Sequence, residues 1–398
     1  MPRSLLPLYA FLSLAAACGT ARYPADGSLA DGPPIEDSDF LSDSMERDGD
    51  LDLDDPDADL PGDGPQQDWR YDAPLETSAY DFTPQMSCRA LPLPCLPTST
   101  PDLVEVTGST EMEAAFNKAT AGQTIQVKGL ALGDGWIIPP YVTLRGCASA
   151  SIERLIRFEG SGGAIEGFTV SGYIVANKTG TYAIRANHFV AGSTEPAFAV
   201  TAQDANMPVT ITAVVDGNIF SKRQHGIRVR TDWDTGTRDL NVTIKNNIFT
   251  GVDSAITVSE SGAAGHISVF IEHNTIYGFD RGVIFEHLQT PPALRATVFM
   301  EGNEGIRSNG PYDVLDSLTW KVMTPAVTPA RQGVLAIGAP QFVDAANDDF
   351  RFPPSSPLVD KVAPTARVPD TDYYGCSRPV AISGAEARAD IGAIELQH

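Results

Sequence analysis

Basic residues are scarce in this sequence of 398 residues, which has 28 Lys and Arg against 51 Asp and Glu and a formal net charge of −23. A chain that binds nucleic acid needs a basic patch to neutralise phosphates, and no clustered stripe of Lys or Arg is present. We therefore expect no nucleic-acid partner. Long apolar runs are scarce too, since the run at residues 5–14 is too short to span a bilayer.

Cysteine pairs at two-residue spacing and paired histidines are absent, which argues against a structural zinc site. Cys18 lies in an N-terminal segment, residues 1–18, that has the features of an export signal. The other four, Cys88, Cys95, Cys147 and Cys376, are an even number that suits two disulfides in an exported chain. The sequence leaves three pairings open. The short separation of Cys88 and Cys95 makes that pair the preferred one.

A helical period is absent between residues 140 and 310, and a repeat is found there instead. Five asparagines recur at intervals of 31, 29, 27 and 29 residues, and a fixed period of this size indicates coils that stack and bury one another. Asparagine tolerates the positive φ of a sharp corner, and stacked asparagines can bond in a ladder. The predicted ladder consists of Asn187, Asn218, Asn247, Asn274 and Asn303.

A short apolar segment follows each of the first four asparagines by about eight residues. In it inward-facing apolar residues alternate with outward-facing ones, as they do in a half-buried strand. Three short strands per repeat, rich in Val, Ile and Thr, predict an all-β parallel β-helix with coils about 4.8 Å apart. The predicted inward residues are Phe198, Val200, Ile227, Val229, Ile256, Val258, Val283 and Phe285. The predicted outward rows are Ala199, Arg228, Thr257 and Ile284, beside Thr201, Arg230, Ser259 and Glu286.

Two segments resemble known β-helix proteins. Thr110-Glu111-Met112-Glu113 has the spacing of a capping box and precedes apolar residues at helical spacing, which is similar to the N-terminal cap of secreted pectate-lyase-like proteins. Residues 340–396, which end in Asp390-Ile391-Gly392-Ala393-Ile394-Glu395, resemble the C-terminal region of bacterial surface proteins of the right-handed parallel β-helix class. The resemblance implies a right-handed, single-stranded β-helix with a short capping helix and an irregular C-terminal cap. In that cap we interpret Asp372, Arg378, Asp390 and Glu395 as internal ion pairs.

The leader, residues 1–18, has one basic residue, an apolar core and small residues directly before Cys18. It resembles a bacterial lipoprotein signal in which this cysteine is lipidated, although Ala15 stands where that family most often has Leu. An ordinary cleavage site with an incidental cysteine is the alternative. We expect a lipoprotein of the outer membrane or cell surface, otherwise a secreted protein, with membrane contact through the lipid alone.

Residues 19–85 contain 19 Asp or Glu against three Arg, too much like charge and too little apolar surface to fold. We expect a disordered acidic linker there. The β-helix with its N-terminal cap should then occupy residues 86–339 and the C-terminal cap residues 340–398. The sequence does not indicate an oligomeric state.

The outward rows carry the candidate site. Arg228 and Arg230 can bind uronate carboxylates bidentately, Trp233 can stack on a sugar face, and Glu286 and His287 lie on a neighbouring coil. Asp232, Asp234 and Glu260 make calcium the candidate cofactor. The alternative is a solvated strand face in which these arginines simply pair with the carboxylates.

We expect this surface to bind a polysaccharide without turnover. Polysaccharide lyases of the β-helix superfamily, which the chain resembles in fold, use calcium and a basic residue for β-elimination, and Lys222, Arg228 and Arg230 are the candidates for that role here. Lys222 is the preferred base because an arginine gives up its proton with great difficulty. A non-catalytic structural or adhesive stalk is the third possibility, and the glycan is not indicated.

Overall fold

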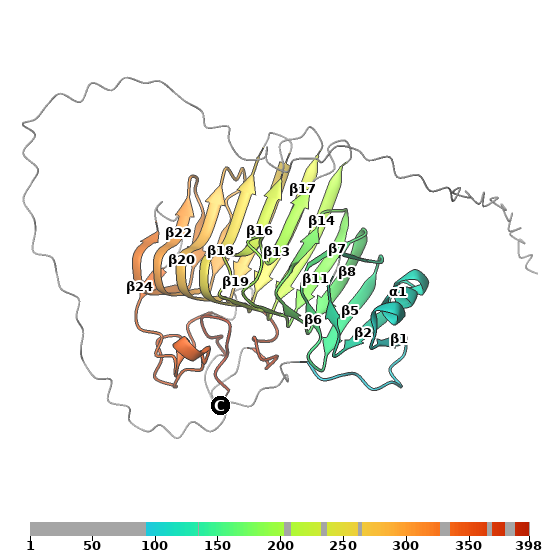
Figure 1. Cartoon of the computed structure of the whole chain (residues 1–398). Helices are drawn as coiled ribbons and strands as arrows, with labels where there is room; N and C mark the ends of the chain where they lie inside the picture. The colour runs from blue at the N-terminus through green and yellow to red at the C-terminus, as the bar shows by residue number, and fades with distance from the viewer. Residues whose placement is uncertain are drawn as a thin grey trace, which may run out of the picture. The chain divides into compact units, whose positions relative to one another are not determined.

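The computed structural model describes residues 93–397 except residues 134, 203–207, 232–236, 262–264, 327–334, 364–367 and 379–386. In this part the chain forms a parallel β-helix (Figure 1). Strands that neighbour each other in a sheet come from successive coils, and the ladders between the described strands are all parallel. The predicted fold class is therefore confirmed.

One sheet of ten strands forms the first face of the coils. Its strands are β1 (Leu103–Val106), β2 (Thr124–Lys128), β5 (Val142–Cys147), β8 (Ser161–Glu166), β11 (Gly180–Arg185), β14 (Val209–Asp216), β17 (Arg238–Lys245), β19 (Gly265–Glu272), β21 (Ala293–Arg295) and β23 (Asp313–Leu315).

A second sheet of 15 strands bends around the coils and supplies two faces, which we call the short face and the third face. The short face has β3 (Ala131–Leu132), β6 (Ser151–Ile152), β9 (Thr169–Val170), β12 (His188–Phe189) and β15 (Ile219–Ser221). The third face has β4 (Trp136–Ile138), β7 (Leu155–Phe158), β10 (Tyr173–Ala176), β13 (Phe198–Ala202) and β16 (His225–Thr231). In later coils one strand runs through both faces: β18 (Ile248–Glu260), β20 (Thr275–Glu286), β22 (Val298–Ser308) and β24 (Ser317–Ala326), followed by β25 (Leu335–Ile337).

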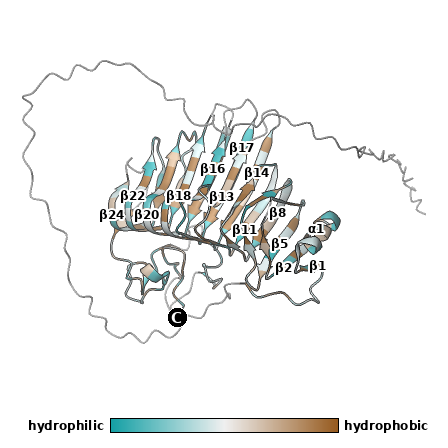
Figure 2. Ribbon diagram, viewed as in Figure 1, coloured by the Kyte–Doolittle hydropathy of each residue, from teal (hydrophilic) through white to brown (hydrophobic). Residues whose placement is uncertain are grey.

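The core lies inside the coils, and hydropathy alternates along many of the strands as a consequence (Figure 2). The predicted inward residues, such as Phe198 and Val229, are at most 2% exposed. Phe189, Phe220 and Phe249 stack face to face along the axis, with 4.6 Å between successive ring centroids. Burying each of these side chains stabilises the fold by about 1.5–3 kcal/mol.

A ladder of buried amides joins the first sheet to the short face. Asn187 donates to Oδ1 of Asn218 at 3.1 Å, Asn218 to Asn247 at 2.9 Å, and Asn247 to Asn274 at 3.1 Å. Each of the first three also bonds through its backbone N–H to the next Oδ1 at 3.0 Å. The side chains therefore bond coil to coil, in addition to the strands.

Asn303 does not belong to this ladder, so that part of the prediction is wrong. The strand register aligns Asn274 with Thr297, whose N–H bonds to the hydroxyl of Ser317 in the following coil at 3.2 Å. Asn303 lies on an exposed corner and donates to Asp280 at 2.8 Å. In the shorter coils that follow Asn274, hydroxyl side chains therefore occupy the position of the ladder asparagines.

The position with positive φ is also different from the predicted one. The ladder asparagines have negative φ, and the residue directly before each of them takes the left-handed conformation. This column includes Gly217 (φ 63°), Asn246 (φ 53°) and His273 (φ 51°). The corner therefore uses two residues, one that turns the backbone and one that bonds along the stack.

The front coil is covered by α1 (Ser109–Lys118), which buries Met112 and Ala115 against the core. The predicted capping box is wrong in register, because Thr110 lies inside the helix. Instead Glu111 accepts hydrogen bonds from N and Oγ1 of Thr107 at 2.7 and 2.9 Å. Among the residues that the structure describes, no helix has the length and apolarity needed to cross a membrane.

The described residues of the C-terminal segment, which lie between 338 and 397, pack along the short face (Figure 1). It includes one 3₁₀ helix, η1 (Ala345–Asn347). Its apolar side chains cover an outward row that includes Ile248, Val298 and Leu318. Within this part of the cap the packing is therefore lateral and spans several coils.

A buried polar network attaches this segment to the coils. Arg378, which is 6% exposed, forms an ion pair with Glu395 at 3.3 Å and donates to Nδ1 of His273 at 2.8 Å. Asp372 accepts from the backbone N–H groups of Cys376 and Glu395, and Asp390 from that of Asp360. Burial raises the pKa of Asp372 and of Asp390.

Cys95 bonds to Cys147, which ties the segment before the first strand to β5. The preferred pairing of Cys88 with Cys95 is therefore wrong. That pairing was predicted from proximity in the sequence. In the structure Cys147 ends a strand that lies beside Cys95, although the two cysteines are 52 residues apart. Cys376 is also disulfide-bonded. Cys18, Cys88 and the acidic residues 19–85 lie outside the described part of the chain.

Candidate functional site

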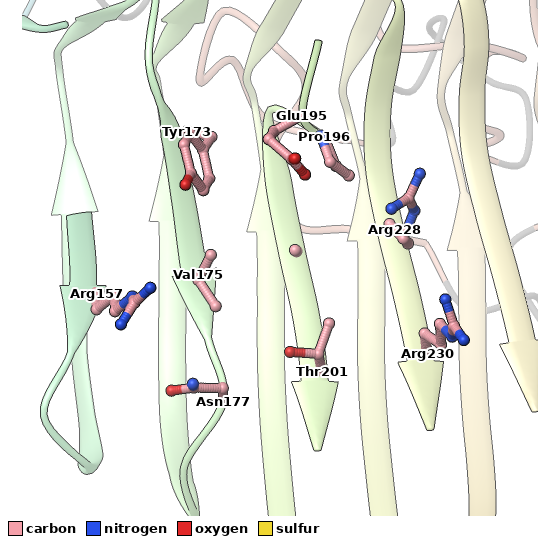
Figure 3. Close-up of a pocket in the computed structure, with 10 residues that line it drawn as sticks. Arg157, Tyr173, Val175, Asn177, Glu195, Pro196, Thr201, Arg228 and Arg230 are labelled. Carbon is pink, nitrogen blue, oxygen red and sulfur yellow. The ribbon is translucent and has the colours of Figure 1, made fainter. Parts of the chain in front are cut away.

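A pocket of about 270 Å³ opens on the third face, where β7, β10, β13 and β16 run side by side (Figure 3). Because the residues of a strand alternate between the two sides of a sheet, every second side chain of these strands points away from the core and toward solvent. Three of the outward side chains that line the pocket are arginines, so we call it the arginine pocket.

One outward row crosses the whole pocket. The register pairs Arg157 with Val175, Val175 with Ala199, and Ala199 with Arg228. Two arginines therefore stand at the ends of a floor made of two small apolar residues. Paired strands are about 4.8 Å apart, so the backbones of Arg157 and Arg228, which are three strand spacings apart, are separated by about 14 Å. We call each strand level along the stack a rung.

A second outward row lies beside the first. Thr201 pairs with Arg230, and Asn177 follows the end of β10 on the other side of Thr201. This row offers the amide of Asn177 next to the apolar floor and a third guanidinium at the same end as Arg228, whereas the hydroxyl oxygen of Thr201 is buried. Hydrogen-bonding groups of these types suit the hydroxyls of a sugar.

Tyr173 supplies the aromatic surface of the pocket. Its half-buried ring lines both the arginine pocket and a neighbouring hollow of about 430 Å³ that contains Arg154 and Ser193. An aromatic ring with one apolar face and a polar hydroxyl can pack on a sugar ring and still bond to water or a hydroxyl.

Glu195 and Pro196 form the rim of the pocket on the loop between β12 and β13. This loop is fixed by Arg223, a side chain only 1% exposed. Its guanidinium donates to the carbonyl oxygens of Ser171, Gly172 and Val190 at 2.9–3.0 Å and to that of Glu195 at 3.3 Å. A buried guanidinium on four carbonyls holds the backbone of the rim in place.

The described lining of the pocket is basic although the protein is acidic, because three arginines there face a single carboxylate. His225 lies behind the rim, where its carbonyl accepts the N–H of Ala197 at 3.0 Å. Burial lowers the pKa of His225 and the charge of Arg228 lowers it further, while Asp253 and Glu195 act in the opposite direction. The imidazole is therefore neutral at pH 7, and the positive charge of the pocket comes from arginine.

The structure places Arg228 and Arg230 in the pocket, on the outward rows that the sequence predicts. Lys222, the preferred base, does not line it. Lys222 is an exposed corner residue with φ 52°, and it belongs to a second column of positive φ together with Gly251.

Three further predicted residues, Glu260, Glu286 and His287, are described by the structure and are not among those that line the pocket. Glu286 and His287 are exposed, and Glu286 is two rungs from Arg230. His287 bonds to Asn309. Glu260 is 2% exposed and accepts the N–H of Gln289 at 2.8 Å, so its contact is with a neighbouring coil. Asp232, Trp233 and Asp234 lie outside the described residues.

Sequence reasoning missed Arg157, Tyr173, Asn177 and Glu195. The first three lie in or directly after strands of early coils, before the first of the regularly spaced asparagines, Asn187. The alternation in Leu155-Ile156-Arg157-Phe158 was the available signal, because it marks a strand with Arg157 facing outward. Glu195 lies in a loop, and no periodic pattern marked it.

The described residues contain no group of three or more His, Cys, Asp or Glu side chains placed to hold a metal ion. Two of the three predicted calcium ligands lie outside those residues. Calcium therefore stays a prediction, and the described pocket presents guanidinium, amide and aromatic groups and one carboxylate, that of Glu195.

No family model matches the chain, and no curated protein matches it. Among solved structures it is similar to the pectate lyase Pel9A at 12% sequence identity, over 72% of this chain and 90% of that one, with a TM-score of 0.28.

Proposed function

We propose that this protein binds an anionic, uronate-containing polysaccharide in the arginine pocket, without turnover. One observation carries the proposal: Arg157 and Arg228 flank an uncharged floor on a single outward row of an exposed β-helix face. Guanidinium groups bind carboxylates through paired, charge-assisted hydrogen bonds. Fixed on stacked strands, they meet an extended chain at a defined spacing.

The shape of the site supports a chain in preference to a single sugar. Four successive rungs contribute lining residues, and Tyr173 continues the surface into the neighbouring hollow. A polymer can contact both arginine ends at once, and the two contacts then reinforce each other because the second is intramolecular.

Titration with polygalacturonate, alginate and a neutral glucan tests the proposal. We expect saturable binding of at least one uronan, no binding of the glucan, and affinity that falls with added salt because the contacts are ionic. The ultraviolet absorbance of unsaturated uronides, followed with and without calcium, reports elimination in the same samples.

Each result distinguishes one function. Binding with constant absorbance supports the binding protein, and rising absorbance supports a lyase whose base is Arg157, Arg228 or Arg230, since Lys222 lies outside the pocket. Absence of binding to both uronans would contradict the proposal and favour a structural or adhesive stalk.

We also propose that Cys18 carries a lipid that holds the protein at the cell surface, with residues 19–85 as a spacer. Metabolic labelling with palmitate tests this, since label should be incorporated into the wild-type chain and not into Cys18→Ser. Equal labelling of the two chains would contradict it.

A further inference from the structure

We propose that Glu195 is a specificity residue that weakens binding of a fully charged uronate chain, so that the pocket prefers a chain with uncharged units between its negative ones. This inference rests on the proposed function and concerns the same site. It names the pattern of charge that the ligand carries, which uronate recognition by itself leaves open.

The strand register gives the pattern of charge along the pocket. Going from β7 to β16, the first outward row is positive, neutral, neutral and positive, through Arg157, Val175, Ala199 and Arg228. In the second row, Thr201 is again uncharged and Arg230 repeats the positive end. Arginines that can neutralise negative groups of a ligand therefore stand at the two ends of the row, with their backbones about 14 Å apart, and neither strand between them carries an arginine in this row.

Glu195 adds repulsion at the neutral centre. It belongs to the same rim as Pro196, shortly before the strand that carries Ala199, and it is the single carboxylate among the lining residues that the structure describes. A ligand carboxylate at the central rungs meets this charge with no arginine of its own rung to offset it. Like charges brought together in this way disfavour the wrong partner.

The rim cannot move away easily. Arg223 bonds to the carbonyl of Glu195 itself and to those of Val190, Ser171 and Gly172, so it joins the loop to the preceding coil. A backbone fixed by a guanidinium that is 1% exposed keeps the Glu195 carboxylate at the rim. Selection by a fixed charge follows from this anchoring.

The test uses one glycan backbone in three states of charge. The probes are oligogalacturonates long enough to cover four rungs, supplied with free carboxyls, with half of the carboxyls methyl-esterified, and with all of them esterified. We expect the half-esterified probe to bind about 2- to 5-fold more tightly than the free-acid probe, the range that an exposed charge pair supports.

Glu195→Gln should raise affinity for the free-acid probe by the same factor and change affinity for the half-esterified probe by less than about 2-fold. The gain should shrink in high salt because the charge is exposed. Glu113→Gln on α1 is the matched control, since it removes the same charge from an exposed site outside the pocket, and it should change neither affinity.

The inference is overturned if the ratio of the two affinities is the same in the wild type and in Glu195→Gln. In that case binding of both probes, with none to the fully esterified one, would leave uronate recognition by the arginines intact. Equal binding of all three probes would instead overturn the arginine contacts, and with them the proposed function.

Discussion

The side-chain amide of Asn187 donates to Oδ1 of Asn218 in the next coil at 3.1 Å, and that same oxygen also accepts the backbone N–H of Asn187 at 3.0 Å. Asn218 in turn donates to the carbonyl of Ile184 and to Oδ1 of Asn247, both at 2.9 Å. One side chain therefore bonds to groups of the coil before it and of the coil after it. Its loss leaves buried partners on both sides unpaired.

Asn218→Ala should lower the free energy of unfolding by about 2–4 kcal/mol, because several buried polar groups lose their hydrogen bonds. Denaturant unfolding measures this change. The matched control is Asn303→Ala, since Asn303 is exposed and bonds only to Asp280 among the contacts described, and it should change stability by less than about 0.5 kcal/mol. Equal effects of the two substitutions would contradict the ladder.

The contrast between these two asparagines shows what a repeat in the sequence can predict. The regular spacing was sufficient to predict the ladder positions from Asn187 to Asn274, because each of these asparagines directly precedes a strand of the short face. Asn303 continues the spacing, but its coil is shorter, and the register moves the ladder position to Thr297. A period alone does not show where residues have been lost from a coil.

The short face shows a signal that was present and not used. Ile219-Phe220 and Ile248-Phe249 place two large apolar residues side by side in a strand, so both sides of that strand must be buried. The phenylalanines stack inside the coils, and the isoleucines lie under the C-terminal segment. Lateral packing of that segment was therefore predictable from the strands it covers.

Acid should weaken the attachment of the C-terminal segment through His273. Arginine can only donate, so Nδ1 of His273 accepts from Arg378 and the imidazole is neutral in the folded state. Burial, followed by the charge of Arg378, lowers the pKa of His273 well below 6.5. The unfolded chain therefore binds a proton below about pH 6.5 that the folded chain does not, and stability falls as the pH drops.

His273→Asn isolates this contribution, and Asn246 already occupies the same corner position one coil earlier with φ 53°. The slope of the histidine term is at most about 1.4 kcal/mol per pH unit. The stability advantage of the wild type over the variant should thus shrink between pH 7 and pH 5. Asp372 and Asp390, whose raised pKa values act in the opposite direction, are unchanged in both proteins. Parallel unfolding profiles over this range would contradict the account.

Replacing Arg223 should loosen the rim of the pocket. Arg223→Met leaves four carbonyl contacts unmade and should cost about 2–4 kcal/mol in unfolding free energy. Amide hydrogen exchange in residues 190–196 should become faster in the folded protein, because the loop loses its anchor. Lys222→Met is the control at the neighbouring exposed corner and should change neither quantity. Unchanged exchange in Arg223→Met would show that other contacts hold the rim.

The candidate site was predicted only at one end. Arg228 and Arg230 follow from strand alternation, since any outward residue of a coil falls in a row with its neighbours. Arg157 stands at the far end of the same row but three coils away, and only the register shows that the two face one pocket. Arg223 could not be assigned from sequence because its burial depends on a loop that folds back over it.

The most direct test of the account is the affinity of an Arg157→Ala/Arg228→Ala double variant for half-esterified oligogalacturonate, compared with Arg185→Ala on the exposed side of β11. Loss of two charge-assisted contacts should raise Kd at least about tenfold, whereas the control should bind like the wild type. A double variant that binds as tightly as the wild type, with its fold intact by circular dichroism, would contradict the claim that this pocket recognises uronates.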